Sequence, residues 1–411
     1  MKIEIDGTRL SAEIEELAAI SDAEAPAVTR IVFTPTDLKA RRWLIGRCEK
    51  SGLAVRQDAI GNIFARWAGS DVGAPAICTG SHIDAIPNAG KYDGVVGVLG
   101  GLEAIRTLRE SGLRPKRSIE LLVFTSEEPT RFGIGCLGSR LLSGTMCADA
   151  ARTLTNKDGS KLEDVRRAAG LTGLLEEVKL KSDYRAFVEL HIEQGPLLER
   201  QKVPLGIVTQ IAAPASLRIS IEGAGGHAGG VSMPDRRDAL CAAAELILAV
   251  ENAGRSSGAV DTVATVGICD VFPGAVNSIP SRVQLSVDIR DTSVERRDKA
   301  MREIEGARQS IATKRQVSIQ TQQLNADAPA DCSPAIIEVL SEDCKRQGHS
   351  FMRMVSRAYH DSLFMSRIAP IAMLFIPCRK GYSHRPDEYA SPEDIARGVT
   401  VLAETLAVLA E

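Results

Sequence analysis

The chain has 411 residues, which exceeds what a single hydrophobic core usually supports, so we expect two domains. Apolar residues make up 44% and charged residues 25% of the sequence, and both values are ordinary for a globular protein. The formal net charge of −3 gives no indication of a nucleic-acid partner or of binding to an acidic membrane surface.

The first ten residues, MKIEIDGTRL, lack the apolar centre of a signal peptide, and no apolar stretch is long enough to span a bilayer. The nine cysteines are scattered singly and form no CxxC pair. An odd number of cysteines in a chain of this length favours reduced thiols. These features predict a cytoplasmic protein that has no membrane partner.

The N-terminal part of the sequence alternates strand-like and helix-like segments. Apolar residues recur at three- and four-residue spacing over Val95–Glu110, which predicts a helix. Strands are predicted at Ala76–Gly80, Ser118–Thr125 and Ala186–Leu190. This alternation indicates an α/β domain with a mixed, mainly parallel sheet that is covered by helices.

Residues 213–327 follow a different pattern. The predicted order is strand, helix, two strands, helix and strand, at Leu217–Ile221, Asp235–Asn252, Thr262–Val271, Arg282–Arg290, Val294–Thr313 and Val317–Thr321. The order βαββαβ is typical of a ferredoxin-like α+β unit. We therefore expect this unit to be inserted into a domain made of residues 1–212 and 328–411. That domain resumes with a strand at Ile371–Pro377 and a last helix capped by Ser391.

Histidines and carboxylates gather at the predicted ends of strands. They lie in the motifs GSHID, KYDGV, FTSEE, ELHIEQG and GYSHRP, which contain His82, Asp93, Glu127, Glu128, His191 and His384. Open α/β sheets bind ligands at the carboxyl edge of their strands. A set of His, Asp and Glu without Cys suits a pair of zinc, manganese, cobalt or nickel ions.

Each motif also has an ordinary structural interpretation. Asp93 precedes the helix at Val95 and suits a helix N-cap, and His82 suits a loop with an incidental Asp84. Glu127 and Glu128 suit a solvated turn. However, two adjacent carboxylates after an apolar strand are costly unless positive charge neutralises them. A metal neutralises them if one glutamate coordinates it and the other accepts a proton from water.

The motifs together resemble the M20 metallopeptidase superfamily, and within it the branch of N-carbamoyl-L-amino-acid hydrolases, allantoate amidohydrolases and β-ureidopropionases. The resemblance extends from about Asp37 to the C-terminus. It rests on the segments GSHIDAIPNAGKYDGVVGVLGGLEAI, FTSEEPTRFG, ELHIEQGPLLE, GGHAGGVSMPDRRDAL and GYSHRP. The HIEQGP segment is similar to the ureido branch and differs from the peptidases and deacylases.

The resemblance implies two divalent ions per subunit (Zn, Mn, Co or Ni), bridged by Asp93. It places His82 and His191 on one ion, and Glu128 and His384 on the other. The general base that it implies is Glu127, and Asp84 is expected to orient the ring of His82.

On the substrate side, the resemblance places Gln194 beside the metals, in contact with the ureido or amide group. Asn277 and Arg290 resemble a pair that grips the substrate carboxylate. His227 resembles a histidine that reaches a neighbouring active site. The resemblance therefore implies a homodimer whose active site is completed across the interface. It also implies that the inserted domain serves as dimerisation domain and lid. His360, with Asp361, is expected to support the site.

Two segments depart from the family pattern. GGVSMP, at residues 229–234, follows the HA of GGHAGG where relatives often have a Thr-Pro-Met run. RAYHDS, at residues 357–362, stands where relatives usually have Gly-Ala-Gly-His-Asp-Ala, and its bulkier Arg357 and Tyr359 change the expected pocket.

The function that follows is metal-dependent hydrolysis of the ureido C–N bond of a small substrate that bears a carboxylate. The preferred substrate is an N-carbamoyl-L-amino acid, which yields the amino acid, carbon dioxide and ammonia. Hydrolysis of allantoate or ureidoglycolate, and of an N-acyl amino acid or dipeptide, would use the same residues. A non-catalytic metal-binding protein of the same fold is the alternative from another class, because fold alone does not imply activity.

Overall fold

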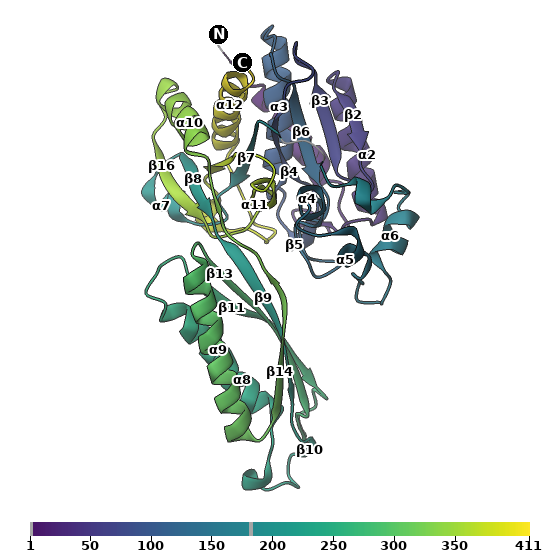
Figure 1. Ribbon diagram of the computed structural model, residues 1–411, viewed down its shortest axis with the longest axis vertical. Helices are drawn as coiled ribbons and strands as arrows, with labels where there is room; N and C mark the ends of the chain where they lie inside the picture. Colours follow the sequence, from purple (N-terminus) through teal and green to yellow (C-terminus); the bar gives the residue numbers. More distant parts are fainter. Residues whose placement is uncertain (1–2, 181–183) are drawn as a thin grey trace. The chain divides into compact units, whose positions relative to one another are not determined.

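The computed structural model describes residues 3–180 and 184–411 (Figure 1). The chain divides into two compact units: Met1–Thr209, Asp331–Ser356 and His360–Glu411 form the first, and Gln210–Ala330 with Arg357–Tyr359 form the second. The ends of the predicted insertion, 213 and 327, differ from those of the segment Gln210–Ala330 by three residues each. The short segment Arg357–Tyr359 also lies in the second unit, although the sequence analysis places it in the first.

The first unit is built on a mixed sheet of nine strands. The strands are β2 (Ala54–Gln57), β3 (Ile63–Trp67), β4 (Ile77–His82), β6 (Ile119–Phe124), β7 (Ala186–Ile192), β8 (Leu205–Ile211), β15 (Ala330–Asp331), β16 (Phe351–Ser356) and β17 (Ile371–Ile376). Their order is β15-β8-β17-β7-β4-β6-β3-β2, and β16 pairs with β8. A separate antiparallel pair joins β1 (Val28–Arg30) to β5 (Ala85–Ala89).

The centre of this sheet is parallel. Strands β17, β7, β4 and β6 run in the same direction, whereas β8 pairs antiparallel with β17, β3 with β6, and β2 with β3. The sheet is therefore mixed, as expected, with four parallel strands at its centre. All four strands are buried along their whole length, and β6, β7 and β17 are mostly apolar, which agrees with this position because central parallel strands are covered on both faces.

Helices cover the sheet of the first unit. They are α1 (Gly7–Ala18), α2 (Pro35–Lys50), α3 (Val95–Glu110), α4 (Leu137–Ser143), α5 (Ala148–Arg152), α6 (Leu162–Ala168), α7 (Leu197–Gln201), α10 (Pro334–Arg346), α11 (Asp361–Met365) and α12 (Pro392–Leu409), with 3-10 turns at Leu175–Glu177 and Arg379–Gly381. Helix α3 has the predicted bounds and packs against β4, β7 and α12. The side chain of Ser391 caps α12 by accepting from the main chain of Asp394, as predicted.

The second unit is a four-stranded antiparallel sheet in the order β11-β13-β9-β14 with two long helices. Its elements are β9 (Ala213–Glu222), α8 (Ala239–Arg255), β11 (Val263–Phe272), β13 (Arg282–Asp291), α9 (Val294–Arg315) and β14 (Ser318–Ala326), with β10 (Gly226–His227), β12 (Ser278–Ile279) and a 3-10 turn at Met233–Asp235. This is the predicted βαββαβ order. Both helices pack on the sheet around a common apolar core (Figure 1).

The first helix of this unit begins later than predicted. The predicted start is Asp235, but α8 begins at Ala239. The carboxylate of Asp238 accepts hydrogen bonds from the main-chain N–H groups of Leu240 and Cys241, so Asp238 is the N-cap. Across the described residues, no helix is both long and apolar enough to cross a membrane.

The pairing of the central strands brings their carboxyl ends to one edge of the sheet. His82 on β4 lies opposite Phe124 on β6, and His191 on β7 lies opposite Phe375 on β17. Close pairing of β4 and β6 depends on Gly80, whose φ is 146°. A Cβ at this position would lie 1.8 Å from the carbonyl oxygen of Leu122.

We expect Gly80→Ala to lower the free energy of unfolding of the first unit by about 3 kcal/mol, because the methyl group forces the two strands apart and strains the backbone. Urea denaturation followed by tryptophan fluorescence measures this change. Both tryptophans, Trp43 and Trp67, lie in the first unit.

Gly46→Ala is the matched control. Gly46 lies within helix α2, and a Cβ there meets nothing within 4 Å. Alanine at this position should raise the free energy of unfolding by about 0.5–1 kcal/mol, because glycine is unfavourable inside a helix. A wild-type unfolding midpoint for Gly80→Ala would contradict the role given to Gly80.

Candidate metal centre

Predicted ligands from distant parts of the sequence meet at the carboxyl edge of the central strands. His82 and His191 end or nearly end β4 and β7, and Glu128 follows β6. Asp93 lies just before α3, and His384 lies in the loop after β17. All of them except His384, which is partly exposed, are buried. The structure therefore brings together the five ligands that the sequence analysis proposes.

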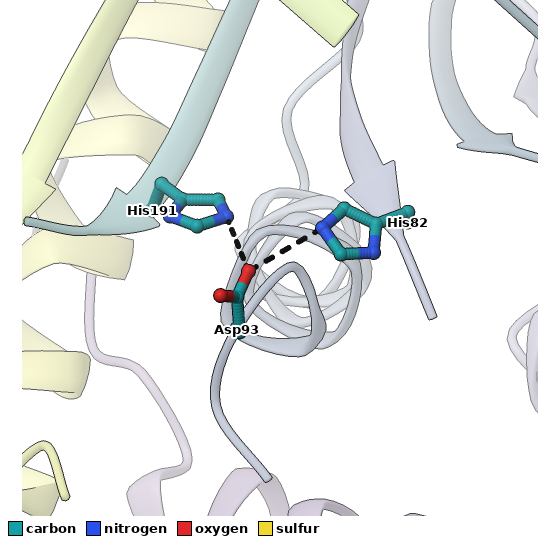
Figure 2. Close-up of side chains that lie close together, drawn as sticks. All are labelled: His82, Asp93 and His191. Carbon is teal, nitrogen blue, oxygen red and sulfur yellow. Dashed lines mark ion pairs between the residues drawn. The ribbon is translucent and has the colours of Figure 1, made fainter. Parts of the chain in front are cut away.

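The carboxylate of Asp93 lies between two histidine rings (Figure 2). Its Oδ1 atom is 3.4 Å from Nε2 of His82 and 3.3 Å from Nε2 of His191. These three residues form one group whose ligand atoms lie within 4.8 Å of one another. A second group shares Asp93 and adds Glu128 and His384. In the second group Nε2 of His384 is 3.4 Å from Oδ2 of Asp93 and 3.2 Å from Oε1 of Glu128.

These separations suit a metal better than direct ion pairs. Two ligand atoms that are each about 2.1 Å from a tetrahedral ion lie about 3.4 Å apart. The four nitrogen–oxygen distances in the two groups lie between 3.2 and 3.4 Å. The two oxygens of Asp93 face different groups, as a bridging carboxylate requires. The donor set of imidazoles and carboxylates therefore fits divalent zinc, manganese, cobalt or nickel.

The main chain fixes which nitrogen of each buried ring is free to bind. Nδ1 of His82 is 3.0 Å from the carbonyl oxygen of Asp84, and Nδ1 of His191 is 2.9 Å from that of Ile192. A carbonyl oxygen only accepts, so both Nδ1 atoms carry the hydrogen. Nε2 of each neutral ring is therefore an acceptor and is the nitrogen that faces Asp93; in His191 it also accepts from the main-chain N–H of Gly94 at 3.1 Å.

Asp84 contacts the ring of His82 through its main chain and not through its carboxylate. Its carbonyl oxygen, rather than its carboxylate, holds the ring of His82, since the nearest carboxylate oxygen is 3.7 Å from Nδ1. The carboxylate accepts hydrogen bonds from the main-chain N–H groups of Glu127 at 3.2 Å and Glu128 at 3.1 Å. Asp84 thus fixes the segment that carries the predicted base and one predicted ligand.

The predicted general base, Glu127, faces the first group. Its Oε2 atom is 3.7 Å from Nε2 of His82, and its Oε1 atom accepts from the thiol of Cys136 at 3.4 Å. Burial raises the pKa of Glu127 well above its ordinary value, against the opposing effect of His82. A carboxyl with a raised pKa is suited to accept and return a proton.

Charge at the site favours a bound cation. Hydrogen bonds with Asp93 and Glu128 raise the pKa of His384 to about 11. Burial opposes protonation of His82, but Glu127, Asp93 and Asp84 together hold its pKa well above the ordinary value. Several buried carboxylates thus stabilise positive charge at the positions that a metal would occupy.

Gln194 lies where the sequence analysis expects it, beside the metal ligands. Its Nε2 atom donates to Oδ2 of Asp93 at 2.6 Å, and its Oε1 atom has no hydrogen-bond partner although it is buried. An unpaired buried acceptor is costly and suits a ligand that donates a hydrogen bond, as a ureido N–H does.

Two residues at the site escaped the sequence analysis. The hydroxyl of Ser383 is 2.7 Å from Oδ2 of Asp93 and 2.9 Å from Oε2 of Glu388. Glu388 also accepts from the main-chain N–H groups of Tyr92 and Asp93. Burial, and then the charge of Asp93, raises the pKa of Glu388 to about 7. The only sequence signal was the proximity of both residues to His384.

His360 and Asp361 lie beside the first group, as expected for a supporting pair. The ring of His360 meets the ring of His191 edge to face, with centroids 4.6 Å apart. Its Nε2 atom is 3.0 Å from the hydroxyl of Ser356. Asp361 is fully buried, and burial followed by the charge of Glu189 raises its pKa to about 8. The nearby carboxylate of Glu193 accepts from the main-chain N–H groups of Leu197 and Leu198 at the start of α7.

The second unit brings His227 close to Asn277. In the β10–β12 pair His227 lies opposite Ser278, and the carbonyl of Asn277 accepts from the main chain of Ala228. Arg290 lies at the far end of β13, where its guanidinium binds Asp288 and lies 5.2 Å from the ring centroid of Tyr359. The eight residue-to-residue steps from Arg282 to Arg290 span about 26 Å of strand. Asn277 and Arg290 of one chain therefore lie too far apart to bind one carboxylate, so the expected pair needs one residue from each of two subunits.

Comparisons with known proteins agree with this geometry. The model of peptidase family M20/M25/M40 matches residues 78–408. A ureidoglycolate hydrolase of Arabidopsis thaliana is 51% identical over 99% of this chain and 87% of its own length. An N-carbamoyl-L-amino acid amidohydrolase of Geobacillus stearothermophilus is 36% identical over 99% of both chains.

A solved structure is similar over nearly the whole fold. The crystal structure of AtUAH in complex with (S)-hydroxyglycine has a TM-score of 0.95 and 49% identity, and the match covers 99% of this chain and 98% of that one. The family match covers well over half of the sequence and contains both ligand groups. The chain therefore belongs to peptidase family M20/M25/M40, and within it to the amidohydrolase branch that the motifs predict.

Proposed function

We propose that this member of the amidohydrolase branch, a hydrolase of non-peptide C–N bonds, hydrolyses the ureido bond of ureidoglycolate with two divalent ions per subunit. The difference in similarity carries this proposal: 51% identity to a ureidoglycolate hydrolase against 36% to an N-carbamoyl-L-amino acid amidohydrolase. The substrate preferred from sequence alone, an N-carbamoyl-L-amino acid, becomes the second candidate, supported by a relative that matches 99% of the chain.

The chemistry of ureidoglycolate agrees with the ligand of the similar structure. Water adds to the ureido carbon, and the bond to the terminal nitrogen breaks and releases ammonia. The remaining carbamate loses carbon dioxide and leaves hydroxyglycine, the compound bound in AtUAH. Hydroxyglycine carries an amine and a hydroxyl on one carbon, so loss of a second ammonia yields glyoxylate.

The residues at the site have defined roles in this reaction. When bound, the two ions polarise the ureido carbonyl and lower the pKa of the attacking water. His82, Asp93 and His191 would hold one ion, and Asp93, Glu128 and His384 the other. Glu127 takes a proton from the water and delivers it to the leaving nitrogen. The unpaired oxygen of Gln194 accepts a hydrogen bond from the ureido group.

We propose that the other substrate-binding residues act in a homodimer. Because His227 and Asn277 lie at the opposite end of β13 from Arg290, we propose that they complete the site of the partner subunit, while Arg290 binds the carboxylate. The edge strand β11 supports association. It exposes Ile268 and Phe272, and Val276 beyond it is fully exposed. An apolar edge strand is a ready surface for pairing with a second chain.

The first test is ammonia release by protein stripped of metal and reconstituted with manganese, zinc, cobalt or nickel. The panel of substrates contains ureidoglycolate, allantoate, N-carbamoyl-L-amino acids, N-acetyl amino acids and dipeptides. We expect turnover only with metal, and a kcat/KM for ureidoglycolate at least about 100-fold above that for any other substrate, as a buried polar match allows. A preference for an N-carbamoyl-L-amino acid would overturn the substrate but not the metal centre.

Glu127→Gln tests the general base. We expect kcat to fall by about 1,000-fold, because the amide cannot accept the proton, while the protein still binds two ions per chain. Metal analysis after dialysis checks the second part. Turnover within tenfold of wild type would exclude Glu127 as the base.

A mixture of two inactive variants tests the shared site. His227→Ala and Glu127→Gln are each expected to be inactive alone. After subunit exchange at equal amounts, half of the dimers contain one chain of each kind, and one of their two sites has both native residues. We therefore expect about a quarter of wild-type activity. A mixture that stays inactive despite verified exchange would place His227 in the site of its own chain.

A further inference from the structure

Glu388 is a buried glutamate that links the two loops carrying Asp93 and His384. Its Oε1 atom accepts from the main-chain N–H of Tyr92 at 2.8 Å and from that of Asp93 at 3.1 Å. These bonds fix the peptide just before the side chain of Asp93. The bonded residues are 296 and 295 positions apart in the sequence.

The other carboxylate oxygen of Glu388 holds the loop of His384. Oε2 lies 2.9 Å from the hydroxyl of Ser383, which in turn lies 2.7 Å from Oδ2 of Asp93. Glu388, Ser383 and Asp93 therefore form a closed set of contacts, partly through the main chain and partly through side chains. His384 is the residue that follows Ser383.

The fit around Glu388 is tight. Only 5% of the residue is exposed. A Cβ added to Gly90 would lie 2.3 Å from Cβ of Glu388 and 2.4 Å from its Oε1. The main chain at Gly90 therefore closes over this carboxylate, and a glycine is needed there for the approach.

The two ligand groups differ in how firmly their histidines are held. The side chains of His82 and His191 belong to central strands and are 3% and 1% exposed. The side chain of His384 lies in a loop and is 46% exposed, with a left-handed φ of 59°. A histidine in this setting depends on other contacts of its loop for its position.

We propose that Glu388 is a positioning residue that sets the affinity for the ion held by Asp93, Glu128 and His384. This inference rests on the proposed two-ion function. Glu388 belongs to none of the candidate ligand groups: Oε1 accepts from two main-chain N–H groups, and Oε2 shares the single hydroxyl of Ser383 with Asp93. Asp93 has a further support in Gln194, whose Nε2 donates to Oδ2 at 2.6 Å. Loss of Glu388 therefore loosens the His384 loop more than the carboxylate of Asp93, and weakens one ion selectively.

Titration of metal-stripped protein with manganese tests the proposal without any substrate. Calorimetry gives the two affinities, metal analysis gives the number of ions, and electron paramagnetic resonance separates coupled pairs of manganese from single ions. For Glu388→Ala we expect one ion to bind within threefold of its wild-type affinity and the other to bind about 10- to 100-fold more weakly. The single-ion spectrum should then dominate at one equivalent of manganese and persist at two.

Glu388→Gln separates hydrogen bonding from charge. The amide oxygen still accepts from Tyr92 and Asp93, and the amide N–H donates to Ser383, whose hydroxyl remains free to donate to Asp93. We expect both ions to bind within about threefold of wild type. If Glu388→Gln binds as weakly as Glu388→Ala, the negative charge matters rather than the positioning, and the proposal fails.

Two further variants complete the design. Glu404→Ala removes a buried carboxylate of α12 that is bonded to Gln347, and it should leave both affinities unchanged. Ser383→Ala removes the side-chain link alone and should weaken the same ion as Glu388→Ala; it carries the test if Glu388→Ala does not fold.

The outcomes distinguish this inference from the proposed function. Two ions with wild-type affinities in Glu388→Ala, or equal weakening of both, would overturn the positioning role. Failure of the wild-type protein to bind a second ion would overturn the two-ion function instead.

Discussion

The structure depends on one electrostatic constraint: carboxylates are packed together, out of water, at the carboxyl edge of four parallel strands. Asp84, Asp93, Glu127 and Glu128 are all buried there. Such a group is unstable unless cations or hydrogen-bond donors surround it. Three histidines, several main-chain N–H groups and, in the proposed function, two divalent ions meet this need. Close packing of these groups also requires a glycine at position 94, because a Cβ there would lie 2.5 Å from the ring of His82.

Main-chain atoms contribute much of this neutralisation. The carboxylate of Asp84 bonds to N–H groups of the segment that follows β6, and Glu388 bonds to N–H groups of the segment before α3. Carbonyl oxygens select the tautomers of His82 and His191. Buried carboxylates therefore hold the loops around the sheet edge in place, and these loops carry the candidate metal ligands.

The sequence indicated the five candidate ligands because each adjoins a strand, a helix or a motif near a strand end. His82, Asp93 and Glu128 all follow or precede such an element, and parallel strands bring their ends to one edge. The role of Glu388 was not predictable in this way, since its partners are almost 300 residues away and its loop has no periodicity. The expected pair of Asn277 and Arg290 has a different limit. The length of β13, about 26 Å, separates them within one chain, and because that strand was itself predicted, the sequence already indicated that the pair requires two subunits.

The insertion determines the order in which the two units can fold while the chain is being synthesised. Almost all of the inserted unit is the single segment Gln210–Ala330, which has its own apolar core. The segment is therefore able to fold as soon as it leaves the ribosome. The first unit must wait, because β17 pairs with β7 and follows the insertion. Until Ile371–Ile376 emerges, the apolar edge of β7 is unpaired and open to aggregation. His384 and Glu388 emerge later still, so the second group of candidate ligands, Asp93, Glu128 and His384, is completed only at the end of synthesis.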